Sequence, residues 1–160
     1  MCIGMNMNGI VVYGTFHGST KKCAEQLAEL TGFSIIDAKT ALDTDFSQYD
    51  KIVIGSALQG FKVHPDVEKL VDIKGKDFTS QKTYFFQVSV TAKTPKYFQK
   101  KLGDIKVAFF GGKIDWSTLT FPERVIISVI SLICRKSLKN FDNIQDKRIK
   151  KLATEIINKS

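Results

Sequence analysis

The amino-acid sequence predicts an α/β protein with three layers, in which helices cover both faces of a doubly wound, five-stranded parallel sheet of order 2-1-3-4-5. Two observations predict this fold. Short runs rich in β-branched and aromatic residues alternate along the chain with segments of helical periodicity. These runs are also too apolar for a sheet that leaves one face in water. Because crossovers between parallel strands are right-handed, few topologies remain, and this strand order fits them.

Five strands are expected, each at a short apolar run that is rich in β-branched or aromatic residues. They are "GIVVYG" (9–14), "FSIIDA" (33–38), "YDKIVIGSA" (49–57), "KTYFFQVSV" (82–90) and "IKVAFFGG" (105–112).

Four helices are expected to cover the sheet. The first runs over 19–30 and ends before Gly32, the second opens at Pro65, and a short third one begins at Pro95. The last follows Asp142. Apolar residues at helical spacing support the first and last helices: Cys23, Leu27 and Leu30, and Ile149, Leu152, Ala153, Ile156 and Ile157.

The length of 160 residues suits one domain with its own core. We expect a single domain over 1–160, with 1–8 as a loose N-terminal extension and 113–140 as an insertion before the last helix. Three widely spaced cysteines, at positions 2, 23 and 134, favour reduced thiols in the cytoplasm and argue against a zinc site. No secretory signal precedes the first strand, and no apolar run reaches the roughly 18 residues of a membrane-spanning helix.

The net charge of +8 is unevenly distributed. Between residues 93 and 113 the acidic residue Asp104 stands among lysines at 93, 96, 100, 101, 106 and 113. Such an excess indicates an anionic partner (nucleic acid, lipid headgroups or a small polyanionic substrate) or the ordinary charged surface of helices.

Three loops are expected to share one site. In open parallel sheets, ligands bind beyond the carboxyl ends of the strands, where the winding reverses. The loops that follow the first, third and fourth predicted strands end there, namely 15–20, 56–62 and 89–94. All three are small and polar.

The first of these loops, within "GTFHGST" (14–20), has the chemistry of an anion site. A helix that starts near Ser19 presents unpaired N–H groups, Gly18 lets the backbone approach a ligand, and Thr15, Ser19 and Thr20 add hydroxyls. The spacing matches neither a nucleoside-triphosphate loop nor a dinucleotide fingerprint. A site of amides and hydroxyls without a cation fits one terminal phosphomonoester, as on FMN. The alternative is that Ser19 only caps the helix.

These residues resemble a known family. The pattern T-x-x-G-x-T over 15–20 matches the FMN-phosphate motif of flavodoxin-like domains. The stretches "YDKIVIGSALQGFKVHPDVEKLV" (49–71), "YFFQVSVTAKTP" (84–95) and "FFGGKIDW" (109–116) are similar to the bacterial menaquinone-dependent protoporphyrinogen IX dehydrogenases. The chain departs from that group at Gln59 and Gly60, where the dehydrogenases carry an arginine and a tyrosine. It departs again at "KIDWSTLT" (113–120), where they carry a more basic, tyrosine-rich run.

The resemblance implies a flavodoxin-like fold with FMN as cofactor. The first loop would hold the phosphate, and the second and third would flank the isoalloxazine ring. The cofactor-binding residues that it implies are Thr15, Phe16, His17, Gly18, Ser19, Thr20, Ser56, Ala57, Leu58, Gln59, Gly60, Ser89, Val90, Thr91 and Ala92.

The resemblance further implies an oxidoreductase that passes electrons from a reduced substrate through the flavin to a quinone or another acceptor. An anionic tetrapyrrole is a candidate substrate, a homodimer is a candidate assembly, and nucleic acid is not expected as a partner. Two alternatives stay open: a flavodoxin-type electron carrier, and a flavodoxin-like module without cofactor. Shuttle flavodoxins are strongly acidic, whereas this chain has a pI of about 9.4, which favours the enzyme over the carrier.

The segment "FPERVIISVISLICRKSLKN" (121–140) is unusually apolar over 125–134, with basic residues on either side. Ten helical residues are only about 15 Å long, too short to cross a bilayer. Three interpretations stay open: a buried helix beside the last strand, a dimer contact, or a peripheral membrane contact through 121–136 at the inner face of the membrane.

The remaining polar residues give no catalytic set. His17 and His64 have no third ligand at a useful spacing, so no metal site is expected. His64 is a candidate proton relay or an ordinary turn residue before Pro65, and Trp116 either stacks on the ligand or packs under a loop. No catalytic residue is expected beyond these, because a bound flavin carries the redox chemistry itself.

Overall fold

The computed structural model describes residues 6–59, 62–90, 93–133, 135 and 137–159. Its central sheet contains β1 (Gly9–Gly14), β2 (Ser34–Asp37), β3 (Lys51–Gln59), β5 (Thr83–Val88) and β6 (Lys106–Phe109). The order is β2-β1-β3-β5-β6 and all neighbours are parallel, so the predicted doubly wound α/β fold is confirmed. The short strand β4 (Lys62–Val63) was not predicted; it pairs antiparallel with the end of β3.

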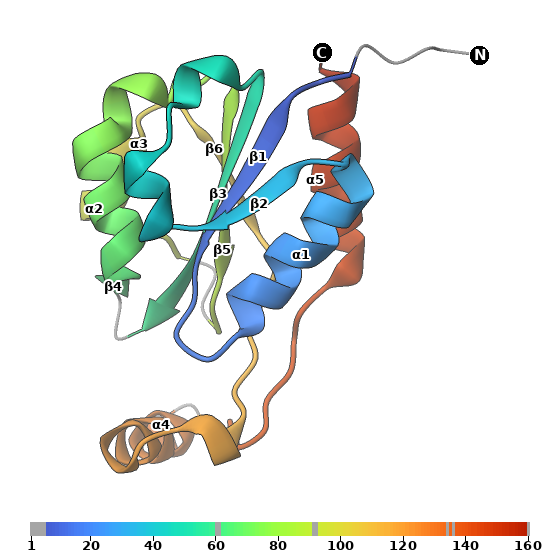
Figure 1. Cartoon of the computed structure of the whole chain (residues 1–160). Helices are drawn as coiled ribbons and strands as arrows, with labels where there is room; N and C mark the ends of the chain where they lie inside the picture. Colours follow the sequence, from blue (N-terminus) through green and yellow to red (C-terminus); the bar gives the residue numbers. More distant parts are fainter. Residues whose placement is uncertain (1–5, 60–61, 91–92, 134, 136, 160) are drawn as a thin grey trace.

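Two pairs of helices enclose the sheet (Figure 1). Helices α1 (Ser19–Thr31) and α5 (Asp146–Asn158) contact each other on one face. Helices α2 (Pro65–Lys74) and α3 (Lys96–Leu102) contact each other on the opposite face. The remaining helix, α4 (Phe121–Ile133), lies apart from both layers, beyond the carboxyl ends of the strands.

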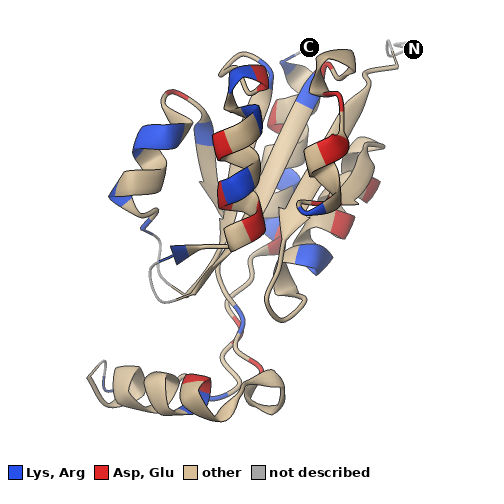
Figure 2. Cartoon of the chain, turned by 60° about the vertical axis from the view of Figure 1, so that its left-hand side comes forward, with Lys and Arg blue, Asp and Glu red and all other residues tan. Residues whose placement is uncertain are grey.

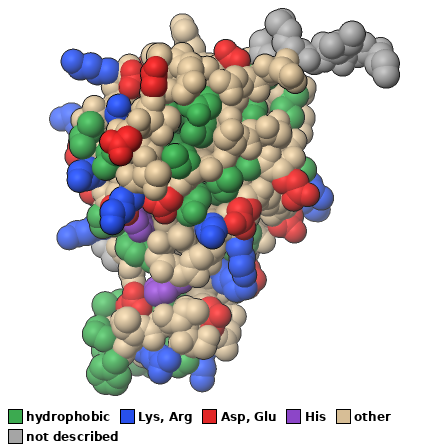
Figure 3. Space-filling view, viewed as in Figure 1, with side chains coloured by type: hydrophobic (Ala, Val, Ile, Leu, Met, Phe, Trp, Pro, Cys, Tyr) green, Lys and Arg blue, Asp and Glu red, His purple; other side chains and the backbone are tan. Residues whose placement is uncertain are grey.

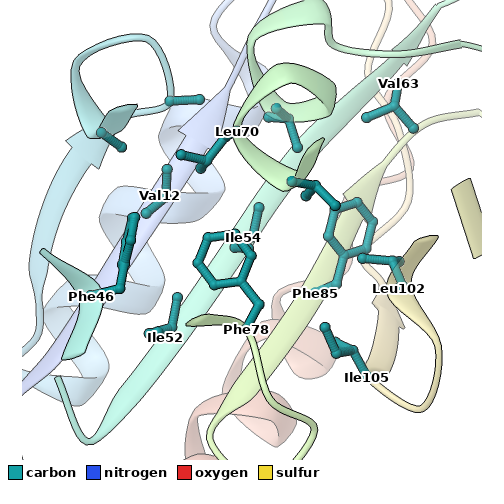
Figure 4. Close-up of a cluster of buried hydrophobic side chains, with 14 of the residues drawn as sticks. Val12, Phe46, Ile52, Ile54, Val63, Leu70, Phe78, Phe85, Leu102 and Ile105 are labelled. Carbon is teal, nitrogen blue, oxygen red and sulfur yellow. The ribbon is translucent and has the colours of Figure 1, made fainter. Parts of the chain in front are cut away.

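Alternating side chains of the central strands divide between two cores, as the period of a strand requires. Ile52 and Ile54 of β3 pack beneath α2 and α3, in the cluster that Figure 4 shows, whereas Val53 packs on the α1 and α5 side. Phe85 and Phe86 of β5 divide in the same way. Both faces of β3 and β5 are therefore buried, which explains why these strands read as continuous apolar runs.

The strands β5 and β6 end earlier than predicted, and their last predicted residues form loops. Gly111 has φ = +90°, a left-handed conformation that glycine adopts most easily, and a Cβ there would clash with Asn143 O. A Cβ on Gly112 would lie 2.4 Å from the carbonyl carbon of Ser89. Gly112 therefore allows the loop after β6 to lie directly against the loop after β5, and Gly111 allows it to lie against Asn143.

Two antiparallel arms, residues 112–116 and 140–143, connect the body to α4; we call them the stalk. Lys113 and Asp142 form an isolated antiparallel bridge between the arms. Ile114 N donates to Phe141 O (2.6 Å), and Asn143 N donates to Gly112 O (2.8 Å). The chain therefore leaves the body and returns to it at the same place.

Helix α4 is not the core helix that the sequence allowed. None of its described side chains is buried. The place beside the last strand, β6, is taken by α5, which contacts it. In the described residues, every helix is too short or too polar to cross a membrane. The expectation of a loose extension over 1–8 falls mainly on residues 1–5, which lie outside the described residues.

Candidate functional site

A cleft of about 550 Å³ lies at the carboxyl ends of β1, β3 and β5, between the sheet edge and α4. The three loops that the sequence predicted to share a site meet here. The cleft is lined by Thr15, Phe16, His17, Gly18, Ser19, Thr20, Lys22, Ala57, Leu58, Gln59, Val88, Ser89, Val90, Lys113, Ile114, Asp115, Leu119, Glu123, Ile126, Ile127 and Ile130.

The loop after β1 presents unpaired donors to the cleft. Thr15 Oγ1 accepts a hydrogen bond from Gly18 N (2.8 Å), which closes the loop in front of α1. Gly18 has φ = +90°, and no atom lies within 4 Å of the place where its Cβ would be. The first hydrogen bond of α1 runs from Lys22 N to Gly18 O (3.1 Å), so within the described residues the amides of residues 19–21 are left for a ligand. The helix dipole adds a positive potential at the same place.

The hydroxyl of Thr20 indicates most clearly that this loop can bind a ligand. The residue is fully buried, and its Oγ1 has no hydrogen-bond partner in the described part of the chain. Leaving a buried hydroxyl unpaired costs about 1–3 kcal/mol, so such atoms are rare without a reason. A ligand oxygen in the cleft would satisfy both this hydroxyl and the free amides. The residues of this loop therefore fit a phosphate group.

The expectation of a site without cations is wrong. Lys22, one turn into α1, and Lys113, in the stalk, both line the cleft. Both are exposed, and Lys113 Nζ lies 3.8 Å from Asp142 Oδ2. Hydrogen bonds from Ser117 lower the pKa of Asp115, a further charged residue at this rim. The lysines therefore add positive charge to the lining of the cleft, to which Asp115 adds a negative charge.

The end of β3 forms a second wall. Ala57, Leu58 and Gln59 line the cleft as predicted, whereas Ser56 differs from the expectation. The Ser56 side chain is buried; its Oγ donates to Ala57 O (2.8 Å) and accepts from His64 N (3.0 Å). This hydroxyl fixes the start of α2 to the sheet. Gly60, the other residue expected here, lies outside the described residues.

The loop after β5 forms the third wall, and a buried amide holds it. Gln87 Nε2 donates to Ser89 Oγ (2.8 Å), and Gln87 Oε1 accepts from Thr94 Oγ1 (2.9 Å). These bonds join the two ends of the loop. Ser89 and Val90 line the cleft, while Thr91 and Ala92 lie outside the described residues. The sequence analysis missed Gln87, although a polar residue inside the apolar run "YFFQV" was a readable signal.

Helix α4 supplies the fourth wall, which the sequence analysis did not predict. Ile126, Ile127 and Ile130 give this wall an apolar surface. Because they recur at i, i+1 and i+4, they lie on one face of the helix. The same face carries Glu123, one turn before Ile127.

Glu123 links α4 to two of the other walls. Its Oε1 accepts a hydrogen bond from Gln59 Nε2 and lies 3.3 Å from His17 Nε2, and its Oε2 accepts from Thr120 N (2.7 Å). We call these contacts the Glu123 clasp. Burial alone would raise the pKa of Glu123, but the hydrogen bonds from Thr120 and Gln59 outweigh it and lower the pKa to about 2. The carboxylate is therefore ionised at neutral pH, and the clasp is fully formed.

The other singled-out residues lie beside the cleft. His64 is the N-cap of α2, where its Nδ1 accepts from Asp66 N (3.3 Å), and its ring packs 4.5 Å from that of Phe16. In the structure, His64 is therefore an ordinary turn residue that caps α2, and it does not line the cleft. Trp116 does not line the cleft; the Arg124 guanidinium lies 5.7 Å and the Lys139 ammonium 5.5 Å from the centre of its ring.

A comparison of the chain with models of known protein families agrees with the fold and with the loop that fits a phosphate group. A family model described as the flavodoxin domain matches residues 10–140. The chain belongs to the flavodoxin domain family. This membership supports FMN as the cofactor of the cleft, and the resemblance to flavodoxin-like domains is confirmed. The closer resemblance to protoporphyrinogen dehydrogenases stays a prediction. No curated protein matches the chain in sequence.

Solved structures share the fold of this flavodoxin domain. A flavodoxin from the domain Archaea has a TM-score of 0.59 at 18% identity, covering 96% of this chain and 98% of that one. Flavodoxin 1 from Bacillus cereus has a TM-score of 0.56 at 15% identity, covering 94% and 97%. The rubredoxin oxygen:oxidoreductase of Desulfovibrio gigas has a TM-score of 0.58 at 14% identity, covering 96% of this chain and 36% of that one. The flavodoxin domain therefore spans about a third of the third protein.

Proposed function

We propose that the chain is an FMN-dependent oxidoreductase that passes electrons from a small reduced substrate to a quinone or another acceptor. Bound FMN would supply the electron-transfer chemistry. The chain's own residues would bind the cofactor, orient it and shield it from water. The observation that carries the proposal is the cleft itself, which has a polar end at the loop after β1 and an apolar wall on α4.

The polar end suits the phosphate of FMN. The amides of residues 19–21, the Ser19 hydroxyl and the unpaired Thr20 hydroxyl would all donate to its oxygens. Thr15 would keep the loop closed through its bond from Gly18 N. The volume lies within the range of about 300–1,000 Å³ that is usual for cofactor and small-molecule sites.

The apolar wall favours an enzyme over a carrier. A carrier exchanges electrons with another protein through an exposed edge of its flavin, and no apolar cover is needed for that. In this chain, Ile126, Ile127 and Ile130 face the loops that would flank the ring. They supply a surface for a small, largely apolar molecule such as a quinone or a tetrapyrrole. The rim lysines, Lys22 and Lys113, would attract carboxylate groups on such a molecule.

Binding of FMN can be tested with a pair of matched variants. Thr20→Val removes a buried unpaired hydroxyl at the cleft, and Thr83→Val removes another at the amino end of β5, far from the cleft. Without ligand, both variants should be as stable as the parent chain or slightly more stable. Titration of the apoprotein with FMN should give a Kd roughly 10- to 100-fold higher for Thr20→Val, since a hydrogen bond to a charged group is worth about 1.5–3 kcal/mol. Equal FMN affinity in both variants would contradict the proposed phosphate site.

Turnover can be tested anaerobically on the FMN-loaded protein. Protoporphyrinogen should bleach the yellow colour, and a menaquinone analogue should restore it. Ile127→Ser, on the wall of the cleft, should raise the KM for the quinone several-fold. Val129→Ser, two residues on and facing away, should leave it unchanged. A yellow protein that reacts with neither protoporphyrinogen nor the menaquinone analogue, and that reduces only a protein partner, would be an electron carrier. A protein that takes up no FMN would exclude both.

A further inference from the structure

One face of α4 is exposed and apolar along its whole length. Phe121, Leu132 and Ile133 are 80%, 79% and 76% exposed, and Val125 and Val129 are 47% and 50% exposed. These five residues recur at i, i+4, i+8, i+11 and i+12, so they form one continuous stripe. We call it the outer stripe of α4. Figure 3 shows apolar side chains gathered at the end of the molecule that α4 occupies.

The outer stripe is distinct from the face of α4 that closes the cleft. Glu123, Ile127 and Ile130 point toward the cleft, on the other side of the helix. The stalk holds α4 away from both helix layers (Figure 1), and every side chain of the stripe is exposed. A contiguous apolar patch that a protein keeps exposed marks an interaction surface.

Positive charge borders the outer stripe. Arg124 and Lys139 flank the indole of Trp116, and Arg135 lies on the same side, next to Leu132. The acidic residue within α4 is Glu123, and the clasp turns it toward the cleft. The charged residues of α4, Glu123 and Arg124, both lie in its first turn, and the rest of the helix is uncharged in Figure 2. An apolar helix face beside an indole and basic side chains is the composition of a helix that lies in a membrane interface.

We propose that α4 docks on the surface of an anionic lipid bilayer through its outer stripe, with Arg124, Arg135 and Lys139 toward the headgroups. Charge decides between this occupant and a second copy of the chain. Two copies, each with a net charge of +8, would bring the like charges of Arg124, Arg135 and Lys139 together at the contact, whereas anionic lipids attract every basic side chain near their surface. The helix has 13 residues, about 20 Å, so it lies along the surface and does not cross. The proposal concerns the outer stripe and stands independently of the proposed redox function.

The test is co-sedimentation of the full chain, with and without FMN, with phosphatidylcholine vesicles that contain or lack phosphatidylglycerol. The parent chain should bind the anionic vesicles, and added salt should weaken this binding. The double variant Val129→Glu/Leu132→Glu should bind at least tenfold more weakly. Leu30→Glu/Ile73→Glu, which puts the same charges on exposed apolar residues of α1 and α2, is the matched control and should bind like the parent.

Two further measurements keep the test decisive. All variants should take up FMN and unfold at similar temperatures, because the four substituted side chains are exposed. Trp116 is the single tryptophan of the chain, so its emission should shift to the blue on anionic vesicles and be quenched by brominated lipids. Failure of the parent chain to bind overturns the proposal, as does equal loss in the control pair. A dimer that Val129→Glu/Leu132→Glu dissolves, without any vesicle binding, would assign the outer stripe to a second copy.

Discussion

Cys23 lies on the inner face of α1, packed into the core between α1 and α5. Burial is the main cause that raises its pKa to about 12, and the negative charges of Asp146 and Asp142 add to it. Because the thiolate is the reactive form, this side chain is inert at neutral pH for two reasons, protonation and inaccessibility.

We therefore predict that Cys23 resists alkylation in the folded protein. With iodoacetamide at pH 8, peptide mapping by mass spectrometry should find position 23 unmodified after a time that labels it completely in denaturant. The labelling rate should follow the opening of the fold, so added FMN should slow it further. Rapid labelling of the native protein would show that α1 is less firmly packed than the structure indicates.

Small polar residues at strand ends show what sequence alone cannot distinguish. Ser19, Thr20, Ser56 and Ser89 look alike in the sequence, since each follows an apolar run. The Ser56 hydroxyl bonds to Ala57 O and to His64 N, and the second of these comes close only when α2 has docked. The Ser89 hydroxyl accepts from Gln87 Nε2, whereas the Thr20 hydroxyl has no partner among the described residues. Which hydroxyls stay free for a ligand depends on such tertiary partners, and a local pattern does not contain them.

At the scale of a single element, the position of α4 depends on the Glu123 clasp. The carboxyl of Glu123 has a pKa of about 2 in the folded chain, below its ordinary value of 4.5. Because the pKa of Glu123 is lower in the folded chain, its carboxylate stabilises the folded arrangement fully at every pH above the ordinary pKa of 4.5. That stabilisation is lost as the pH falls through the folded pKa.

We predict that the order of α4 is constant from neutral pH down to about 4.5 and is lost between there and about 2. Trp116 emission, which reports on Arg124 and Lys139 beside its ring, measures the change. Glu123→Gln keeps an acceptor for Gln59 and Thr120 but removes the titrating charge, so its acid curve should lack this transition. Glu123→Ala should loosen α4 already at pH 7, with faster amide exchange over 121–133. Identical acid curves for the parent chain and Glu123→Gln would contradict the assignment.

The elements of the sheet were predictable because each one carries its own signal. The runs at 9–14 and 51–59 are buried on both faces, and Gly32 ends α1 in the left-handed conformation (φ = +74°). The place of α4 was not predictable in this way. Its apolar sequence fits a core helix equally well, but α5 covers the last strand and the stalk holds α4 away. Which of two apolar helices covers a given face of the sheet depends on the packing of the whole chain, and the sequence of either helix alone does not determine it.

At the scale of the molecule, FMN should stabilise the fold by mass action. At a free concentration about 100-fold above its Kd, a ligand adds about 2.7 kcal/mol to the free energy of unfolding. For a chain of this size we predict a rise in Tm of about 5–10 °C. Riboflavin, which has the same ring but no phosphate, should give a clearly smaller rise at the same concentration. Equal shifts would show that the loop after β1 does not hold the phosphate.

The arms of the stalk are paired where they meet the body, at the bridge between Lys113 and Asp142. Whatever lies beyond that pairing is a loop already closed at its base, and the entropy of closing a loop grows only slowly with its length. We therefore expect that the segment between the two arms can be exchanged without disturbing the body. A different segment grafted at the same junction would keep the register of the sheet and the loop after β1. It would replace the wall of the cleft that α4 supplies, and it would replace the surface through which the molecule docks.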